Sequence, residues 1–261
     1  TDDRWSFVNF NGSVGLVNGA DAPIKFNGSA ISAMTITGAG LTGNTATLVG
    51  ITSYRSRTYF WQESSQDFWY SSVDTLGGAL TKFPLSRVGQ FGGSIIAMGN
   101  WSQGGQAAEW GQGGSLEQYL VTVLSSGEIV VYRGADPGDA TDFSLISVFK
   151  VGSPLGSRCL VKVAGDLIVM TVDGFVPMSA IMQAGRFSAN NAITDKIRKA
   201  ITDVTTEYAP NVGWDCIYYP RGNAVLFNIP ISSTTYYQYV VNTVSGSWCR
   251  YTGMNAYCWA L

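Results

Sequence analysis

The strongest constraint on the fold is a repeated pattern of short apolar runs separated by turn-forming residues. Within each run apolar and polar residues alternate, and clusters of Gly, Asn, Asp and Ser divide one run from the next. Alternation with a period of two is typical of β-strands, and Gly-containing clusters favour tight turns. Four clusters have the chemistry of hairpin turns, namely SSGE (125–128), VAGD (163–166), VDGF (172–175) and PRGN (220–223). The sequence therefore predicts an all-β protein.

The predicted strands fall into five groups along the chain. The first group is 6–10, 14–17 and 24–26; the second is 47–54, 58–62 and 68–72; the third is 94–99, 119–124 and 128–132; the fourth is 145–150, 159–163, 167–171 and 175–178; the fifth is 215–219, 224–229, 236–241 and 247–251. The last residues, NAYCWAL, look like the start of a further strand.

The spacing of these groups favours a β-propeller. They recur at roughly 40–50 residues, which is the length of a four-stranded propeller blade. A β-sandwich is the competing architecture, but it normally needs about seven to nine strands, fewer than are predicted here. We expect one propeller domain over residues 1–261 with five or six blades. Because the first residue is not Met and the last strand has no closing turn, we also expect the domain to be truncated at one or both ends.

One segment departs from the β pattern. Between 192 and 208, apolar side chains recur at helical spacing, and Pro210 follows. We predict a single inserted amphipathic helix at about 192–208, which either packs on the propeller or docks a neighbouring subunit. Its apolar face consists of Ile193, Ile197, Ile201, Val204 and Tyr208.

Composition excludes several kinds of function. Only 13% of the residues are charged and the net charge is −2, so no broad phosphate-binding surface is expected. No apolar run approaches the ~20 residues of a transmembrane helix, and the N-terminus lacks the pattern of a signal peptide. The sequence contains no histidine, which excludes Ser-His-Asp and Cys-His catalysis and metal sites that use imidazole. We expect neither a cofactor nor a bound metal.

The four cysteines have no metal-binding spacing. Cys159, Cys216, Cys249 and Cys258 include no CxxC pair, and each has apolar or aromatic neighbours. We predict four buried free thiols, which suits a reducing compartment.

Three aspartates at intervals of three residues form the most conspicuous candidate site. Asp136, Asp139 and Asp142 follow the strand 129–132 in GADPGDATD. Three carboxylates so close could bind calcium or perform acid–base chemistry, but the ligand rhythm of an EF-hand is missing. Asp-Pro-Gly strongly favours a turn. We therefore interpret the segment as an exposed connection between two blades, with Phe143 beginning the next blade.

Two further segments carry candidate binding residues. The Gly-rich loop 99–114 contains Trp101 and Trp110, which could stack on a sugar, anchor a protein interface or fold back onto the sheet. Arg55, Arg57, Lys82 and Arg87 could form a basic patch, although scattered surface charges are the simpler interpretation. The segment TLGGALTKFPL (75–85) has paired glycines but no nucleotide-binding pattern.

Several long stretches resemble a known family. The stretch 125–179, from SSGEIVVYRGADPGD to VDGFVPMS, resembles structural proteins of short-tailed (podovirus-like) bacteriophages and prophages. LGGALTKFPL (76–85) and NTVSGSWCRYTG (242–253) are similar to further stretches of the same family.

The resemblance implies a β-propeller subunit of a tail-tube hub or nozzle. Such a subunit would be a non-enzymatic virion protein, assembled in the bacterial cytoplasm. It would form a ring with copies of itself and contact adjacent tail or portal proteins, while DNA passes through without specific recognition and no membrane is involved. The residues leave two alternatives: a carbohydrate-binding propeller for host-surface recognition, and a glycoside hydrolase that uses a carboxylate pair.

Overall fold

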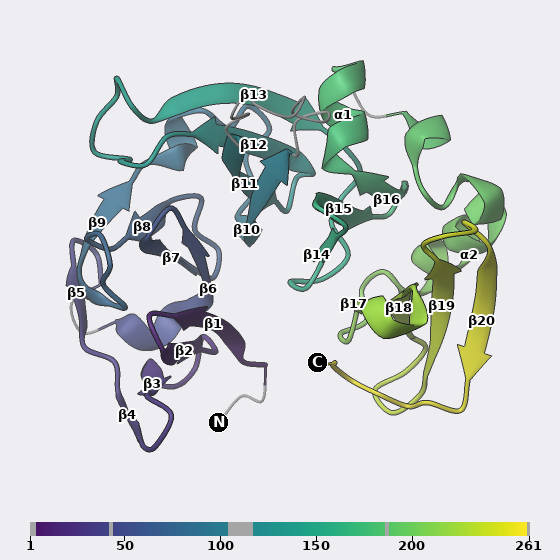
Figure 1. Ribbon diagram of the computed structural model, residues 1–261, viewed down its shortest axis with the longest axis horizontal. Helices are drawn as coiled ribbons and strands as arrows, with labels where there is room; N and C mark the ends of the chain where they lie inside the picture. The colour runs from purple at the N-terminus through teal and green to yellow at the C-terminus, as the bar shows by residue number, and fades with distance from the viewer. Residues whose placement is uncertain (1–3, 42–43, 104–116, 186–187, 260–261) are drawn as a thin grey trace, which may run out of the picture. The chain divides into compact units, whose positions relative to one another are not determined.

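The computed structural model describes residues 4–41, 44–103, 117–185 and 188–259, and these form an all-β chain (Figure 1). Their strands make five sheets, which are blades of a β-propeller, so the predicted fold class is confirmed with five blades in the described residues. The chain divides into two compact units, Thr1–Asn100 with Gln118–Val148, and Trp101–Glu117 with Phe149–Leu261. That all 261 residues form a single domain stays a prediction.

The first sheet is an antiparallel meander in the order β1-β2-β3-β4. Its last strand was not predicted, because a three-residue strand leaves little periodicity to detect. The four strands are β1 (Ser6–Phe10), β2 (Ser13–Val17), β3 (Ile24–Phe26) and β4 (Ile31–Ala33).

The second sheet has an additional strand at one edge. Its order is β5-β9-β8-β7-β6, and β5 pairs with β9 in parallel, whereas the other pairs are antiparallel. The chain therefore runs along one edge of this sheet before it enters the opposite edge as β6. Both β5 and β9 were missed by the sequence analysis, which interpreted 75–85 only as a Gly-containing segment. The strands are β5 (Ile36–Gly38), β6 (Leu48–Tyr54), β7 (Arg57–Gln62), β8 (Phe68–Tyr70) and β9 (Gly78–Phe83).

The third sheet corrects a predicted blade boundary. Its order is β10-β11-β12-β13, so the strand predicted at 145–150 ends this sheet and does not begin the next one. The segment 134–142 therefore connects two strands of one blade, and our interpretation of it as a connection between blades was wrong. The strands are β10 (Ile95–Gln103), β11 (Glu117–Leu124), β12 (Glu128–Arg133) and β13 (Ser144–Lys150).

The second unit contains the fourth and fifth sheets. The fourth has the order β14-β15-β16, and the fifth has the order β17-β18-β19-β20, both with antiparallel pairing. No strand follows β20 in the described residues, which end at 259, so NAYCWAL is not a strand there. The strands are β14 (Leu160–Val163), β15 (Asp166–Thr171), β16 (Gly174–Pro177), β17 (Asp215–Tyr219), β18 (Ala224–Pro230), β19 (Tyr236–Asn242) and β20 (Trp248–Thr252).

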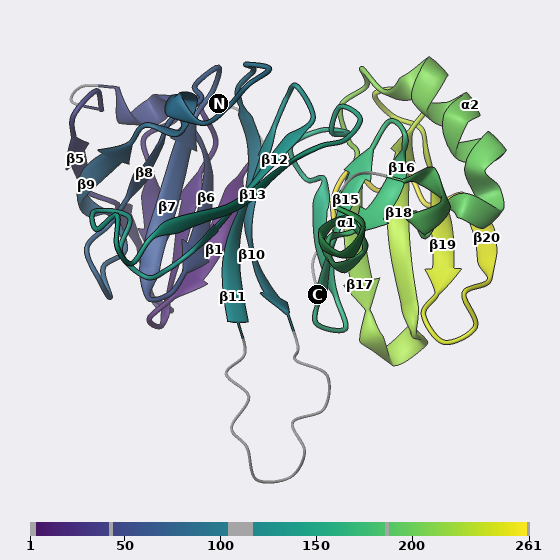
Figure 2. The same ribbon diagram turned by 90° about the horizontal axis from the view of Figure 1, so that it is seen from above.

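The helical segment begins later than predicted. The α-helix α2 spans Arg198–Tyr208, and a second short helix, α1 (Met178–Ala184), was not predicted (Figure 2). The chain before α2 is instead bonded to β16. The Ile193 amide donates to the Phe175 carbonyl at 2.9 Å, and the Phe175 amide donates to Thr194 Oγ1 at 3.1 Å. These bonds to the edge of the fourth sheet replace the first turn of the predicted helix.

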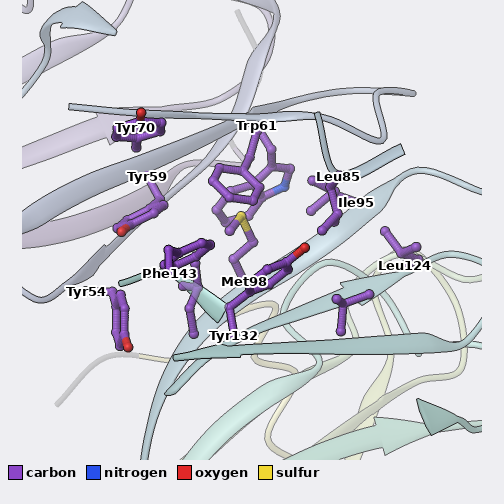
Figure 3. Close-up of a cluster of buried hydrophobic side chains, with 13 residues drawn as sticks. Tyr54, Tyr59, Trp61, Tyr70, Leu85, Ile95, Met98, Leu124, Tyr132 and Phe143 are labelled. Atoms are coloured by element: carbon purple, nitrogen blue, oxygen red, sulfur yellow. The ribbon is translucent and has the colours of Figure 1, made fainter. Parts of the chain in front are cut away.

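Aromatic side chains join the second and third sheets of the first unit (Figure 3). Phe68 stacks on Phe83 with ring centroids 4.7 Å apart, and Tyr132 stacks on Phe143 at 4.6 Å. Phe83 then meets both rings of the second pair edge to face, at 5.5 and 5.4 Å. Tyr59, which is fully buried, packs against Phe68 on the second sheet. Aromatic pairs of this kind contribute roughly 0.5–1.5 kcal/mol each beyond the area that they bury.

Phe143→Ala tests the importance of this cluster. Phe143 is 5% exposed, and its removal leaves a cavity beside Tyr132, so we expect a loss of about 3–5 kcal/mol in the free energy of unfolding. Leu145→Ala, two residues further along and 44% exposed, is the control and should cost no more than about 1 kcal/mol. Urea denaturation measures both. Equal losses for the two variants would contradict the assignment of Phe143 to the core.

Candidate functional site

The three aspartates of the loop 134–142 accept hydrogen bonds from backbone amides of the same loop. Asp142 Oδ2 accepts hydrogen bonds from the amides of Ala135 at 2.6 Å and Asp136 at 2.7 Å. Asp136 Oδ1 accepts from the Gly138 amide at 3.0 Å, and Asp139 Oδ1 accepts from the Thr141 amide at 2.8 Å and hydroxyl at 2.7 Å. Each carboxylate therefore satisfies backbone donors within two to seven residues, which is how Asp stabilises turns.

The hydrogen bonds also set the titration of this loop. The Thr141 hydroxyl and amide lower the pKa of Asp139, and the amides of Asp136 and Ala135 lower the pKa of Asp142, because they favour the charged carboxylates. No group of three or more Asp, Glu or Cys residues suited to a metal ion occurs in the described part of the chain. Our interpretation that the aspartates form a turn agrees with these contacts.

A glycine at the start of the loop permits a close backbone crossing. Gly134 has a φ of +128°, and a Cβ on it would lie 2.1 Å from the Asp142 carbonyl oxygen. Only glycine fits at this point, because any side chain would collide with backbone. The crossing brings the two ends of the loop together, so that β13 can pair beside β12.

Arg57 was underestimated by the sequence analysis. Its side chain is 12% exposed, and its Nη2 lies 3.2 Å from Asp136 Oδ1. Its Nε donates to the Ala135 carbonyl at 3.1 Å, and its Nη1 donates to the Ser71 carbonyl at 2.9 Å. Arg57 thus ties the loop of the third sheet to the second sheet, and it is not one of several scattered surface charges. The sequence of β7 gives no local signal for this, because Arg57 stands at the end of a continuous run of buried residues and not in an alternating pattern.

A buried carboxylate escaped the sequence analysis altogether. Glu128, at the start of β12, is fully buried, and its carboxylate accepts from the amides of Gln90 at 2.9 Å and Phe91 at 3.0 Å. The bonds fix the connection before β10 against the turn before β12. Nothing local in the sequence distinguishes this Glu from the exposed turn residue that SSGE suggests.

The cysteines differ from one another more than predicted. All four are free, but Cys159 is buried and Cys216 is half-buried, whereas Cys249 and Cys258 are exposed. Burial raises the pKa of Cys159 to about 12 and also raises that of Cys216. The prediction of buried thiols was therefore wrong for Cys249, which lies on the solvent side of β20, and for Cys258.

The two candidate tryptophans are not brought together as a described site. Trp101 lies on β10 with 1% of its surface exposed, which agrees with the alternative that its ring packs back onto the protein; the alternatives of sugar stacking and docking were wrong for it. Its position on a strand, where side chains alternate in direction, explains the burial. Trp110 lies outside the described residues, and its role stays a prediction.

The first sheet presents an apolar face to solvent. Cross-strand pairing places two rows of residues on this face, because paired residues in neighbouring strands point the same way. The side chains of Phe7, Phe26 and Ile31 are 59%, 37% and 68% exposed. We call this surface the open face of the first sheet; its rows are Phe7, Leu16, Ile24 and Ala33, and Asn9, Val14, Phe26 and Ile31.

The opposite face of the same sheet is covered at β1 and β2, whereas Ser32 on β4 is exposed there. Val8 and Val17 pack into a cluster with residues of the second sheet, including Ile51. At Gly15 a Cβ would lie 2.7 Å from Leu76 Cδ1 and 3.1 Å from Ile51 Cδ1, so the glycine permits a close approach of the two sheets. The strands β1 and β2 are thus apolar on both faces. Strands of this composition are typically buried on both sides.

The comparisons with known proteins support the fold alone. No protein-family model matches the chain, and no curated protein sequence matches it either. Among solved structures the chain is similar to the dihydro-heme d1 dehydrogenase NirN in complex with DHE, with a TM-score of 0.51 and 10% identity. That match covers 93% of this chain and 45% of the other, so the chain spans less than half the length of that protein.

A second similar structure is the complex of the fission yeast SREBP–SCAP binding domains. Its TM-score is 0.41, with 9% identity over 97% of this chain and 75% of the other.

None of the helices in the described ranges is long and apolar enough to span a membrane.

Asp142→Asn tests the role of the loop carboxylates. Hydrogen bonds hold the folded pKa of Asp142 below its unfolded value, so its contribution to stability is present above the unfolded pKa and is lost as the pH falls through the folded pKa. We expect the variant to melt below the wild type at pH 7, and the difference in Tm to shrink as the pH falls from ~5 towards ~2. Circular dichroism at several pH values measures it. A difference that stays constant with pH would show that the charge on Asp142 does not stabilise the turn.

Proposed function

We propose that the protein is a non-enzymatic structural subunit of the tail of a short-tailed bacteriophage. In this proposal it is assembled in the bacterial cytoplasm and resides in the virion, where it contacts copies of itself and adjacent tail or portal proteins. The observation that carries the proposal is the open face of the first sheet, because a sheet face of this composition needs a partner surface.

The chemistry of the open face supports a permanent protein contact. Among the paired residues of β1 to β4, the two rows on this face contain seven apolar residues, Asn9 and no charged side chain. Monomeric proteins seldom expose large contiguous apolar patches, and such patches commonly mark interaction sites. Charged residues are depleted in the buried centres of interfaces, and the whole chain is only 13% charged.

The position of the family resemblance in the fold adds support. The stretch 125–179 includes β12 to β16, 76–85 includes β9, and 242–253 includes β20. Of these strands β12 is buried from Glu128 to Tyr132, whereas β20 is largely exposed. A resemblance that includes whole strands bears on the fold of the subunit, which suits a family whose role is assembly.

Two measurements on phage particles test the proposal. Particles induced from the bacterium that carries the gene should contain the protein, as mass spectrometry of purified virions would show. The gene should also lie beside portal, terminase and tail genes. Absence of the protein from the particles, together with a distant gene, would overturn the proposal.

Paired variants connect the open face to assembly. Ile31→Asp places a charge on that face, whereas Ser32→Asp places one on the opposite side of the same strand at an exposed position. We expect Ile31→Asp to reduce incorporation into particles at least tenfold and Ser32→Asp to leave it nearly unchanged. Melting curves of the two isolated proteins verify that each is folded.

A further inference from the structure

Residues 254–259, which follow β20, lie across one face of the fifth sheet. Strand pairing places Asp215 of β17, Asn228 of β18 and Gln238 of β19 in a single row on this face. The row runs across the strands, and residues 254–259 follow it back towards β17 (Figure 1). We call the three side chains the polar ladder and residues 254–259 the crossing segment.

The polar ladder binds the main chain of the crossing segment. Gln238 Nε2 donates to the Met254 carbonyl at 2.9 Å, and Asn228 Nδ2 donates to the Ala256 carbonyl at 2.9 Å. Strands lie about 4.8 Å apart and an extended chain advances about 3.3 Å per residue, so neighbouring strands can reach main-chain groups two residues apart. The ladder is therefore spaced to hold an extended polypeptide.

Asp215 holds the other end of the crossing segment. Its Oδ2 accepts from the Trp259 amide at 3.2 Å and lies 3.4 Å from Arg158 Nη1, so the carboxylate is paired. Asp215 is 7% exposed, and Asn228 and Gln238 are fully buried. A buried polar group that loses its partner costs about 1–3 kcal/mol, so this face needs a main chain over it.

Two contacts of side chains fit this particular segment to the sheet. Asn255 Oδ1 accepts from the Tyr236 amide at 3.0 Å, and the Tyr257 ring meets the Tyr236 ring edge to face at 6.2 Å. The fit identifies residues 254–259 as the ligand of the polar ladder, whichever copy of the chain supplies them.

The crossing segment is held shallowly. None of its residues is buried, and Met254, Asn255 and Cys258 are exposed. A segment with few buried apolar contacts opens locally while the rest of the protein stays folded. The crossing segment can therefore leave its own sheet without the loss of the fifth sheet.

A glycine links the crossing segment to β20. Gly253 is exposed and has a φ of +89°, and a Cβ on it would have no heavy atom within 4 Å. Glycine populates both signs of φ readily, so this position can redirect the segment and leave β20 in place. It has the properties of a hinge.

We propose that, in the assembled tail, the polar ladder of each copy holds the crossing segment of a neighbouring copy. The inference rests on the proposed function, and it names a contact between subunits. The same hydrogen bonds form in either arrangement, so the exchange has to offset only the loss of freedom on association, which a high local concentration reduces.

The exchange joins two different surfaces, because each copy gives one segment and receives another. A heterologous contact of this kind continues from copy to copy and produces a ring when the rotation closes. It therefore supplies the type of interface that a ring-forming subunit needs.

Photo-crosslinking from the crossing segment tests the exchange. Tyr257→p-benzoylphenylalanine keeps an aromatic ring beside Tyr236, and irradiation links it to the nearby chain. In purified particles and in the concentrated protein we expect covalent dimers, with the link located by mass spectrometry on the peptide that contains Tyr236. Links that stay within one chain would overturn the proposal.

Two further variants make the result specific. Tyr237→p-benzoylphenylalanine, on the opposite face of β19, is the matched control and should give at least tenfold fewer dimers. Adding Asn255→Ala to the Tyr257 variant removes the bond to the Tyr236 amide and should lower the dimer yield at least threefold. Equal yields in either comparison would contradict the exchange, and melting curves verify that the variants are folded.

The two samples separate this inference from the proposed function. If the protein is present in virions but its links there stay within one chain, the proposed function stands and the inference fails. If the protein is absent from virions and the concentrated protein forms the dimers, the exchange stands and the proposed function fails. If it is absent and the links stay within one chain, both fail.

Discussion

The structure depends on the packing of apolar and aromatic side chains between facing sheets. Each blade is a small sheet that cannot bury enough apolar surface alone, so its stability comes from its neighbours. In the first unit the four rings of Phe68, Phe83, Tyr132 and Phe143 provide this contact between the second and third sheets. The hydrogen bonds of each sheet set the register that brings these rings together.

The same constraint explains the aspartate loop. For Phe143 to stack on Tyr132, the loop 134–142 must reverse the chain tightly between β12 and β13. The Asp142 carboxylate binds the start of the loop, Gly134 permits the crossing, and Arg57 ties the loop to the second sheet. Three carboxylates that suggested chemistry therefore serve the placement of one aromatic ring. The rest of the chain has few charged residues, so the three aspartates stand out in the sequence. Their contacts, however, are those of a turn.

Local pattern predicted the strands well and their partners poorly. Alternation and Gly-containing turns located most of the strands, since both signals lie within a few residues. The sheet to which β13 belongs, and the parallel pairing of β5 with β9, depend on contacts distant in sequence. The predicted helix began too early because Ile193 and Thr194 form hydrogen bonds with β16. The spacing of apolar residues carries no information about such bonds. The sequence held a signal for the open face of the first sheet, because β1 and β2 carry apolar residues at both odd and even positions. Only the pairing of the strands shows which of these residues lie together on one face.

The central claim is that the open face of the first sheet is a packing surface whose partner lies in the assembled particle. Hydroxyl-radical footprinting with mass spectrometry measures the solvent access of single side chains, and Phe7 and Phe26 are suitable reporters. The account predicts that both are oxidised readily in the dilute isolated protein and are protected at least fivefold in purified particles, while Leu145 on β13 provides the reference. Equal oxidation of Phe7 and Phe26 in the two states would contradict it.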